Sequence, residues 1–307
     1  MPKPEPNRGS QRIAEVTLLF ITIVWGSSFV VAHFALEADL SPLFILMCRF
    51  FMSAVFIGIV YAKRIRKTFR PRHLKSGILL GTIFLLAFYT QMIGLKYSTP
   101  SNNAIIMSSN VVIVPFLWWL VTKNRPMRSA FLSCGISLVG IAIISFDFSQ
   151  GFTLRIGDVF SLLAAVLFAA QIVAVGEMAQ RIDHCLLVFM EFATAAILAF
   201  IFFIFTDGNF ASFTNAGGVL AVLYMGIVCT CICFLLQAWA MRRVNSSHSA
   251  VIMSMEALFG SLLSILVGTD KLGWRIVVGG LLLFFSVILP ELLRNKQMET
   301  INYSNFN

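Results

Sequence analysis

The sequence predicts an all-α integral membrane protein, with ten transmembrane helices arranged as two inverted five-helix repeats. The prediction rests on composition, on the spacing of apolar segments and on an internal repeat. Only 12% of the 307 residues are charged, whereas 58% are hydrophobic and 30 are phenylalanine. A soluble domain usually carries about 25% charged residues, which cover its surface. Most of the surface of this protein is therefore expected to face lipid.

Ten segments of the chain are apolar over about 20 residues, the length that a helix needs to span a bilayer. These segments are 14–34, 42–62, 74–95, 102–122, 129–146, 157–178, 185–205, 217–240, 247–267 and 273–293. Prolines and charged residues separate them, as at Ser41-Pro42 and Arg125-Pro126. The loops are short, so we expect no soluble domain between the polar ends at 1–13 and 294–307.

Lysines and arginines are concentrated on one side of the predicted membrane. The most basic loop joins the second and third segments and contains Lys63, Arg64, Arg66, Lys67, Arg70, Arg72 and Lys75. The loops on the opposite side contain only Lys96, Arg155, Lys271 and Arg275. Cytoplasmic loops carry the excess of basic residues in membrane proteins. Both termini are therefore predicted in the cytoplasm, in a multi-pass protein of a bacterial plasma (inner) membrane.

The two halves of the sequence share a pattern. Residues 104–108 read Ala-Ile-Ile-Met-Ser, and residues 250–254 read Ala-Val-Ile-Met-Ser. Polar positions match in the same way, pairing Gln91 with Gln237, Asn110 with Glu256, and Arg49 with Glu191. We therefore expect a first repeat at 14–146 and a second at 157–293. Because five helices is an odd number, the second repeat enters the membrane from the other side, as in many secondary transporters with a site near the midplane.

Polar residues at bilayer depth are the candidates for that site. A charge at the centre of a membrane helix costs about 2.5–3.5 kcal/mol on insertion scales, so its presence calls for a role. Glu256 lies near the middle of 247–267 and Asn110 near the middle of 102–122, which favours a shared substrate site. Hydrogen bonding between helices is the alternative. Arg49 either binds a substrate anion, pairs with Glu191 or contacts backbone carbonyls.

Two glutamines lie closer to the membrane faces. Gln91 and Gln237 are related by the repeat and are predicted to line the outer and inner mouths of the pathway, with an interhelical amide contact as the alternative. Pairs of small residues, Gly77 with Gly81 and Gly260 with Ser264, are spaced to let neighbouring helices approach closely.

Several motifs resemble the EamA-like branch of the drug/metabolite transporter superfamily over about residues 10–293. The motifs are Trp25-Gly26-Ser27-Ser28-Phe29, Arg49, the run 94–100 (Gly-Leu-Lys-Tyr-Ser-Thr-Pro), Ser254-Met255-Glu256-Ala257 and Gly279-Gly280. The resemblance implies that the first and sixth helices face a central cavity. That would place Trp25, Ser28 and Gln171 in its lining, with Ser254 added from the matching motif. The acidic residue that often ends the fourth helix in this family is replaced here by Lys123-Asn124-Arg125, whereas Asp270 occupies the corresponding zone of the second repeat.

The expected function is secondary transport, driven by a gradient or facilitative, of a small organic metabolite by alternating access. Export of amino-acid-like or amphiphilic compounds is the favoured form, with protons as a candidate coupling ion. The sequence contains no nucleotide-binding motif of the Gly-x4-Gly-Lys-Ser/Thr type. A membrane-embedded enzyme and a channel are the alternatives, although neither clustered catalytic groups nor rings of charge are evident.

Other partners and cofactors are not expected. The net charge of +9 comes from short basic clusters between apolar segments, which does not favour a nucleic-acid partner. The six cysteines have no metal-ligand or disulfide spacing, and no cofactor, metal or catalytic site is predicted. The partners are then the lipid bilayer and the transported solute, and the sequence does not specify an oligomeric state.

Overall fold

The computed structural model describes residues 8–123, 125–126, 128–147, 153–179, 181–206, 216–240, 243–244 and 246–304. This part of the chain is almost entirely helical. In chain order its helices are α1 (Arg8–Glu37), α2 (Pro42–Val60), α3 (Ala62–Thr68), η1 (Pro71–His73), α4 (Leu74–Lys96), α5 (Pro100–Met107), α6 (Asn110–Thr122), α7 (Arg128–Ser145), α8 (Ile156–Met178), α9 (His184–Thr206), α10 (Ala216–Leu223), η3 (Tyr224–Ile232), α11 (Cys233–Ala240), α12 (Ser246–Val267) and α13 (Trp274–Ser304). A short antiparallel ribbon pairs β1 (Phe146–Asp147) with β2 (Thr153–Leu154).

Each predicted apolar segment is covered by these helices except for one or two residues. In the described residues, 7 helical stretches are long and apolar enough to cross a membrane, and shorter apolar helices cover Arg128–Ile144, Ile252–Val267 and Trp274–Leu289. Large apolar side chains also project outward, such as Phe205 at 83% exposure and Ile59 at 73%. An all-helical membrane protein is therefore confirmed, and the count of ten spans stays a prediction.

Proline and a hydroxyl residue start two of the helices. Ser41 accepts a hydrogen bond from the Phe44 amide at the start of α2, and Pro42 follows it. Thr99 accepts from the Asn102 amide at the start of α5, and Pro100 follows. A hydroxyl cap satisfies an amide that has no partner in the helix, and proline in the first turn loses no hydrogen bond.

Two predicted segments are not single regular helices. The segment 102–122 divides at Ser108 and Ser109, whose hydroxyls donate to the carbonyls of Ile105 and Ile106 at 2.7 Å each. Such side-chain bonds compete with the helical ladder. The segment 217–240 contains α10, the π-helical η3 and α11 in succession.

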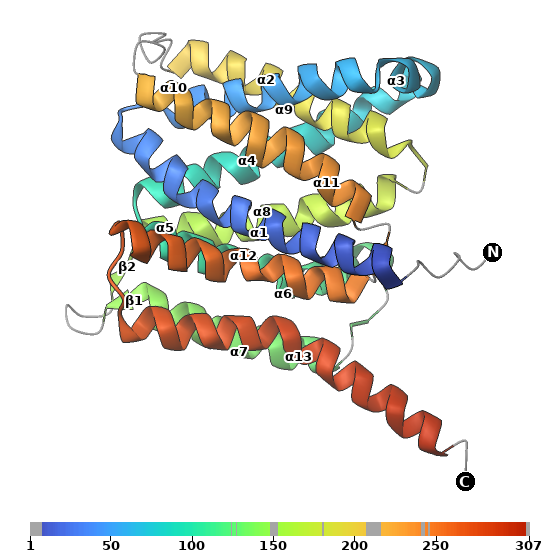
Figure 1. The fold of residues 1–307 in the computed structure, drawn as a ribbon, viewed down its shortest axis with the longest axis vertical. Coiled ribbons are helices and arrows are strands. Elements are labelled where there is room, and N and C mark those ends of the chain that lie inside the picture. The colour runs from blue at the N-terminus through green and yellow to red at the C-terminus, as the bar shows by residue number, and fades with distance from the viewer. Residues whose placement is uncertain are drawn as a thin grey trace.

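The main helix pairs are α1 with α12, α2 with α9, α4 with α8, and α7 with α13. Small residues allow the close approaches that the sequence predicted. A Cβ added at Gly81 of α4 would meet the Glu191 carbonyl of α9 at 2.8 Å, and one at Gly26 of α1 would meet the Gly260 amide of α12 at 2.7 Å. In Figure 1, α7 and α13 form a layer of their own at the bottom of the view.

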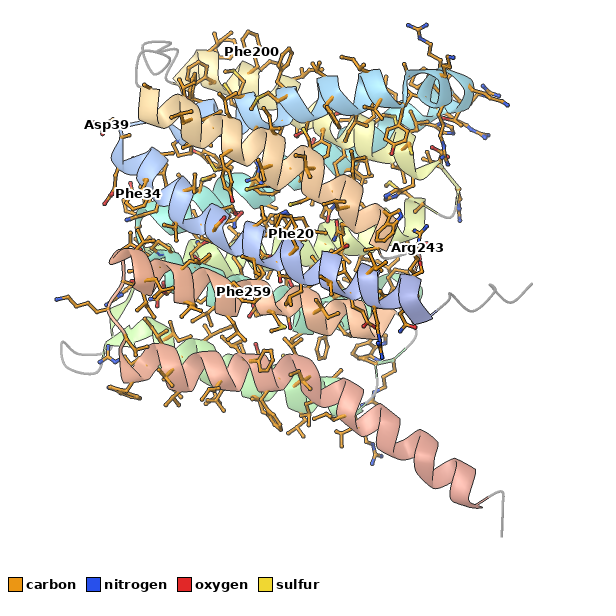
Figure 2. All side chains as sticks on the ribbon, viewed as in Figure 1. Phe20, Phe34, Asp39, Phe200, Arg243 and Phe259 are labelled. Carbon is orange, nitrogen blue, oxygen red and sulfur yellow. The ribbon has the colours of Figure 1, made fainter. Side chains whose placement is uncertain are left out.

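The bundle has two distinct ends, which we name for reference. At the α3 end, α1 begins, α2 ends, α9 begins and α13 ends (Figure 1). At the ribbon end, opposite it, α2, α5 and α8 begin, and α5 and α8 begin close to the β ribbon. Figure 2 labels Arg243 at the α3 end and Asp39 at the ribbon end.

Candidate functional site

A cavity of about 480 Å³ lies between helices from both halves of the chain. Residues of α1, α2, α4, α8, α9, α11 and α12 line it, together with residues near the junction of α5 and α6. Six aromatic side chains contribute to its walls: Trp25, Tyr61, Phe84, Phe88, Phe168 and Phe234. Apolar walls with a few placed polar groups are typical of small-molecule sites.

The cavity extends from the middle of the bundle toward the α3 end. Its deep part contains Arg49 and Glu256, from the central portions of α2 and α12, and Gln91, from the part of α4 nearer the ribbon end. In the other direction it reaches Tyr61 and His184, which stand at the end of α2 and the start of α9. The lining residues therefore run from mid-depth to the α3 end of the bundle.

Arg49 is the cation of the deep part and is 5% exposed. Its Nε donates to the Thr230 hydroxyl at 2.6 Å, and its guanidinium carbon lies 4.6 Å from the centre of the Phe88 ring. The Thr230 hydroxyl in turn donates to the Met225 carbonyl at 2.8 Å. A cation over an aromatic face is stabilised by the ring quadrupole. Arg49 is thus held by a hydroxyl and a ring.

Trp25 joins α1 to the same region. Its indole Nε1 donates to the Cys229 carbonyl at 2.7 Å, and its ring centre lies 5.4 Å from that of Phe234. Ser28 donates to the Trp25 carbonyl at 2.6 Å. These contacts fix the aromatic wall formed by α1 and α11.

Two carboxyl groups face the cavity. Glu191 is 4% exposed, and its Oε1 accepts from Gln171 Nε2 at 2.6 Å. Glu256 lies within electrostatic range of Arg49, yet in the described residues it makes neither a hydrogen bond nor an ion pair. Its side chain is only partly covered by protein. Glu256 is thus the acidic group that remains available to a solute.

All the site residues predicted from the sequence except one line this cavity: Trp25, Ser28, Arg49, Gln91, Asn110, Gln171, Gln237 and Glu256. Ser254 is buried on α12 and is not part of the lining. Arg49 contacts Thr230 and Phe88, while Glu191 bonds to Gln171, so the alternative that pairs Arg49 with Glu191 does not describe the structure. Gln91 and Gln237 line one and the same cavity, and the assignment of each to a separate mouth stays a prediction, as does solute binding by the whole set.

Sequence reasoning did not find the aromatic walls or Thr230. A signal for the walls was present, because Phe88 and Phe234 occupy matching positions of the two halves and both line the cavity. Thirty phenylalanines in a membrane protein hide such a pair, since most of them face lipid or the core. Thr230 carries no sequence signal, because its role depends on the π-helical geometry of η3.

Metal binding finds no support in this part of the chain. In the described residues, no three or more His, Cys, Asp or Glu side chains gather in a way that could hold a metal ion. Cys229, Cys231 and Cys233 are free thiols, buried in η3 and α11.

Comparison with known proteins gives the family. The model of the EamA-like transporter family matches residues 12–146 and again residues 155–290. Two uncharacterized transporters of Archaeoglobus fulgidus are similar, at 29% identity over 91% of this chain and 86% of their own, and at 28% over 89% and 95%. The uncharacterized transporter YoaV of Bacillus subtilis is 21% identical over 89% of this chain and 94% of its own.

A solved crystal structure is similar in fold, with a TM-score of 0.63, 16% identity and coverage of 95% of this chain and 99% of the other. At that identity the likeness shows the fold alone. The two family matches together span most of the sequence, so the chain belongs to the EamA-like transporter family and is a multi-pass membrane protein.

Proposed function

We propose that this protein is a secondary transporter that exports a small organic solute, amino-acid-like or amphiphilic, from the cytoplasm by alternating access. The observation that carries the proposal is the cavity, whose lining runs from mid-depth to the α3 end and includes charged groups at its deep part. The proposal takes this cavity to open at the α3 end only, as one state of an alternating-access carrier requires. A channel in its open state would connect both sides.

The proposal includes ten membrane spans in two inverted repeats, at 14–146 and 157–293. The helix packing supports it, because contacts between two helices are matched by contacts between their counterparts in the other half. Helix α4 packs on α8, and its counterpart α10–η3–α11 packs on α1, which is the counterpart of α8. Likewise α1 packs on α12, and α8 packs on α5 and α6. The two separate family matches fall on the same halves.

One pair of glycines supports the repeat in detail. A Cβ added at Gly81 would meet Thr194 and Glu191 of α9, and one added at Gly226 would meet Met52 and Arg49 of α2. Glu191 and Thr194 are the counterparts of Arg49 and Met52 in the repeat. The same close approach between helices is thus made twice.

The orientation proposed from charge places the α3 end in the cytoplasm. The basic residues of α3 and η1 lie at this end, and α1 begins and α13 ends there (Figure 1). By the positive-inside rule this side is cytoplasmic. The cavity then opens toward the cytoplasm, as loading of an export substrate requires.

The groups in the cavity favour a solute that carries both charges. Arg49 can bind a carboxylate, because a guanidinium offers several charge-assisted donors. Glu256, which has no partner in the described residues, can bind an ammonium group. The aromatic walls suit an apolar body. An amphiphilic cation that uses Glu256 alone is the second candidate.

Flux into sealed liposomes tests the proposal with three matched probes. Phenylalanine carries an ammonium and a carboxylate, phenethylamine only the amine, and 3-phenylpropionate only the carboxylate. We expect saturable uptake, with phenylalanine preferred. An ohmic current would instead indicate a channel, and chemical conversion of a probe an enzyme.

The Glu256→Gln variant separates the two substrate classes. It keeps the shape of the side chain and removes its charge, so uptake of phenylalanine and phenethylamine should fall about tenfold or more, while binding of 3-phenylpropionate is retained. If the flux does not respond to an imposed pH gradient, protons are excluded as the coupling ion. Unchanged flux of all probes in Glu256→Gln would remove this residue from the site.

A further inference from the structure

The helix that contains η3 is irregular at the depth of the cavity. The π-helical stretch Tyr224–Ile232 is 9 residues long, whereas π-helices are mostly single turns and often occur at functional sites. It lies between α10 and α11, so it interrupts one membrane segment near its middle. Inside a membrane, each backbone group displaced from the helical ladder needs another partner.

Two side chains from other helices bond to this stretch. Trp25 of α1 donates to the Cys229 carbonyl at 2.7 Å, and Arg49 of α2 donates from Nε to the Thr230 hydroxyl at 2.6 Å. Inserted side chains are a recognised cause of such irregularities. The π-helical stretch is therefore held by two donors that also line the cavity.

The other repeat offers a contrast to this form. The counterpart of this segment is α4, which is a continuous α-helix from Leu74 to Lys96. In the repeat, Phe168 is the counterpart of Trp25, and Glu191 is the counterpart of Arg49. A phenylalanine has no donor, and the Glu191 carboxyl accepts from Gln171. In the described residues, no side-chain donor from another helix reaches the middle of α4, and the Asn103 amide donates to the Gln91 carbonyl nearer the end of that helix, at 3.2 Å.

The Thr230 hydroxyl can only accept, not donate, in its hydrogen bond with Arg49. Its single hydroxyl proton is donated to the Met225 carbonyl at 2.8 Å, so its oxygen is left to accept from Arg49. That acceptor fixes Nε, and the ring of Phe88 lies against the guanidinium, at 4.6 Å from its carbon. In the described residues, the terminal nitrogens of Arg49 have no hydrogen-bond partner, and the residue lines the cavity.

We propose that Thr230 is a positioning residue, which orients Arg49 so that its terminal nitrogens bind the anionic group of the transported solute. The π-helical form of η3 is what places the Thr230 hydroxyl against Nε. The inference rests on the proposed function in one respect, that the solute carries a carboxylate or a similar anion.

The test compares Thr230→Val with Thr230→Ser in purified protein. Valine keeps the shape and removes the hydroxyl, and serine restores the hydroxyl. Thr206→Val is a matched control, because the Thr206 hydroxyl is exposed and, among the described residues, bonds to Phe202 of its own helix. Binding of 3-phenylpropionate and of phenethylamine is measured on each variant. In Thr230→Val we expect the affinity for 3-phenylpropionate to fall about tenfold and that for phenethylamine to change less than about twofold.

The serine variant and the control should both bind like the wild type. Equal losses for both probes in Thr230→Val would overturn the proposal, since that pattern means general damage to the cavity. No loss for either probe would overturn it as well.

A second measurement keeps this inference separate from the proposed function. If the wild type binds none of the probes, the proposed substrate class fails, and the position of Arg49 is then judged by phenylglyoxal, an arginine-specific reagent. Mass spectrometry of the peptide that contains Arg49 gives its modification rate. A rate that changes about threefold or more in Thr230→Val, and returns in Thr230→Ser, supports the positioning role. An unchanged rate refutes it, whatever the solute.

Discussion

The two ends of the bundle are joined in different ways. At the ribbon end, buried polar side chains tie the helices together. At the α3 end, apolar side chains pack between the helices, and an exposed ion pair joins Arg64 to Asp183. The pair α2 and α9 shows both situations. Near the ribbon end Phe44 and Phe203 pack with ring centres 5.7 Å apart, while Tyr61 and His184 at the other end line the cavity.

The ribbon end has a set of partly buried hydrogen bonds between helices. Ser98 donates to Asp158 at 2.5 Å, joining the end of α4 to the start of α8. Asp270 accepts from the Ser101 amide at 2.9 Å and from Ser264 at 2.7 Å, joining the start of α5 to the end of α12. Buried bonds of this kind are strong when complete and costly when half broken. We infer that the ribbon end opens as a unit, when water can replace all these partners together.

The corresponding region at the α3 end includes an apolar contact. Ala14 and Leu18 of α1 pack there against Ala240 and Val244. An apolar contact has no hydrogen bonds to break when it slides. The difference suggests a firm gate at the ribbon end and a compliant one at the α3 end.

Gly157→Ala is expected to have the largest effect on the opening of the ribbon end. A Cβ at Gly157 would overlap the backbone of Tyr97 and Ser98, where α8 begins against the end of α4. Overpacking of a tight contact costs about 1–3 kcal/mol. The population of the state in which the ribbon end is closed should therefore fall about tenfold or more. A cysteine at Met92, in a background without the native cysteines, reports opening by its labelling with an impermeant maleimide.

The control for this substitution is Gly135→Ala on α7, where an added Cβ meets nothing within 4 Å. It should label like the parent protein. If Gly157→Ala and Gly135→Ala label at the same rate, the ribbon end is not the firm gate.

A smaller effect is expected from Asp270→Ala. The change removes the acceptor for the Ser101 amide and the Ser264 hydroxyl. Loss of a helix cap costs about 1 kcal/mol, so labelling at position 92 should rise about fivefold. Asp270→Asn keeps an acceptor, so its labelling rate should lie between those of the parent protein and Asp270→Ala. Labelling that is lower in Asp270→Ala than in the parent protein would contradict the role of Asp270 in closing this end.

The sequence predicted most of the helices because membrane insertion depends on local properties. An apolar stretch such as 185–205 must form a helix in lipid, whatever its neighbours, since its backbone has no water to bond. The breaks at Ser108 and at η3 were not predicted, because they depend on contacts with other helices. Trp25 and Arg49, which hold η3, lie some 200 residues earlier in the chain.

The site was predicted in part for a similar reason. Depth and the repeat pointed to Glu256, Asn110 and Arg49, and all three line the cavity. Depth does not say which way a helix faces, and so Ser254 was included although it lies outside the lining. The facing of each helix is set by packing, such as the contact of Gly260 with Gly26, which turns α12 toward α1.

The smallest effect is expected at the α3 end, from Asp183→Asn. Arg64 donates to Asp183 from Nε at 3.0 Å and from Nη2 at 2.7 Å, and half of the Arg64 side chain is exposed. Burial acts to raise the pKa of Asp183, but the hydrogen bond and charge of Arg64 and the amides of Leu186 and Cys185 outweigh it, so the pKa is lowered. A lowered pKa stabilises the folded state above the ordinary value of about 3.8, and the stabilisation is lost as the pH falls through the lowered value.

Exposed ion pairs contribute about 0.2–1 kcal/mol and are screened by salt. Asparagine keeps the cap that Asp183 gives to α9 and removes only the charge. At neutral pH, Asp183→Asn should therefore lower the free energy of unfolding by less than about 1 kcal/mol, and the difference should vanish in about 1 M salt or in acid. The free energies of unfolding of the parent, of Asp183→Asn and of Asp183→Asn combined with Arg64→Gln measure the contribution of this ion pair. A difference that persists in high salt would mean that the α3 end is tied as firmly as the ribbon end, and the contrast between the two gates would be lost.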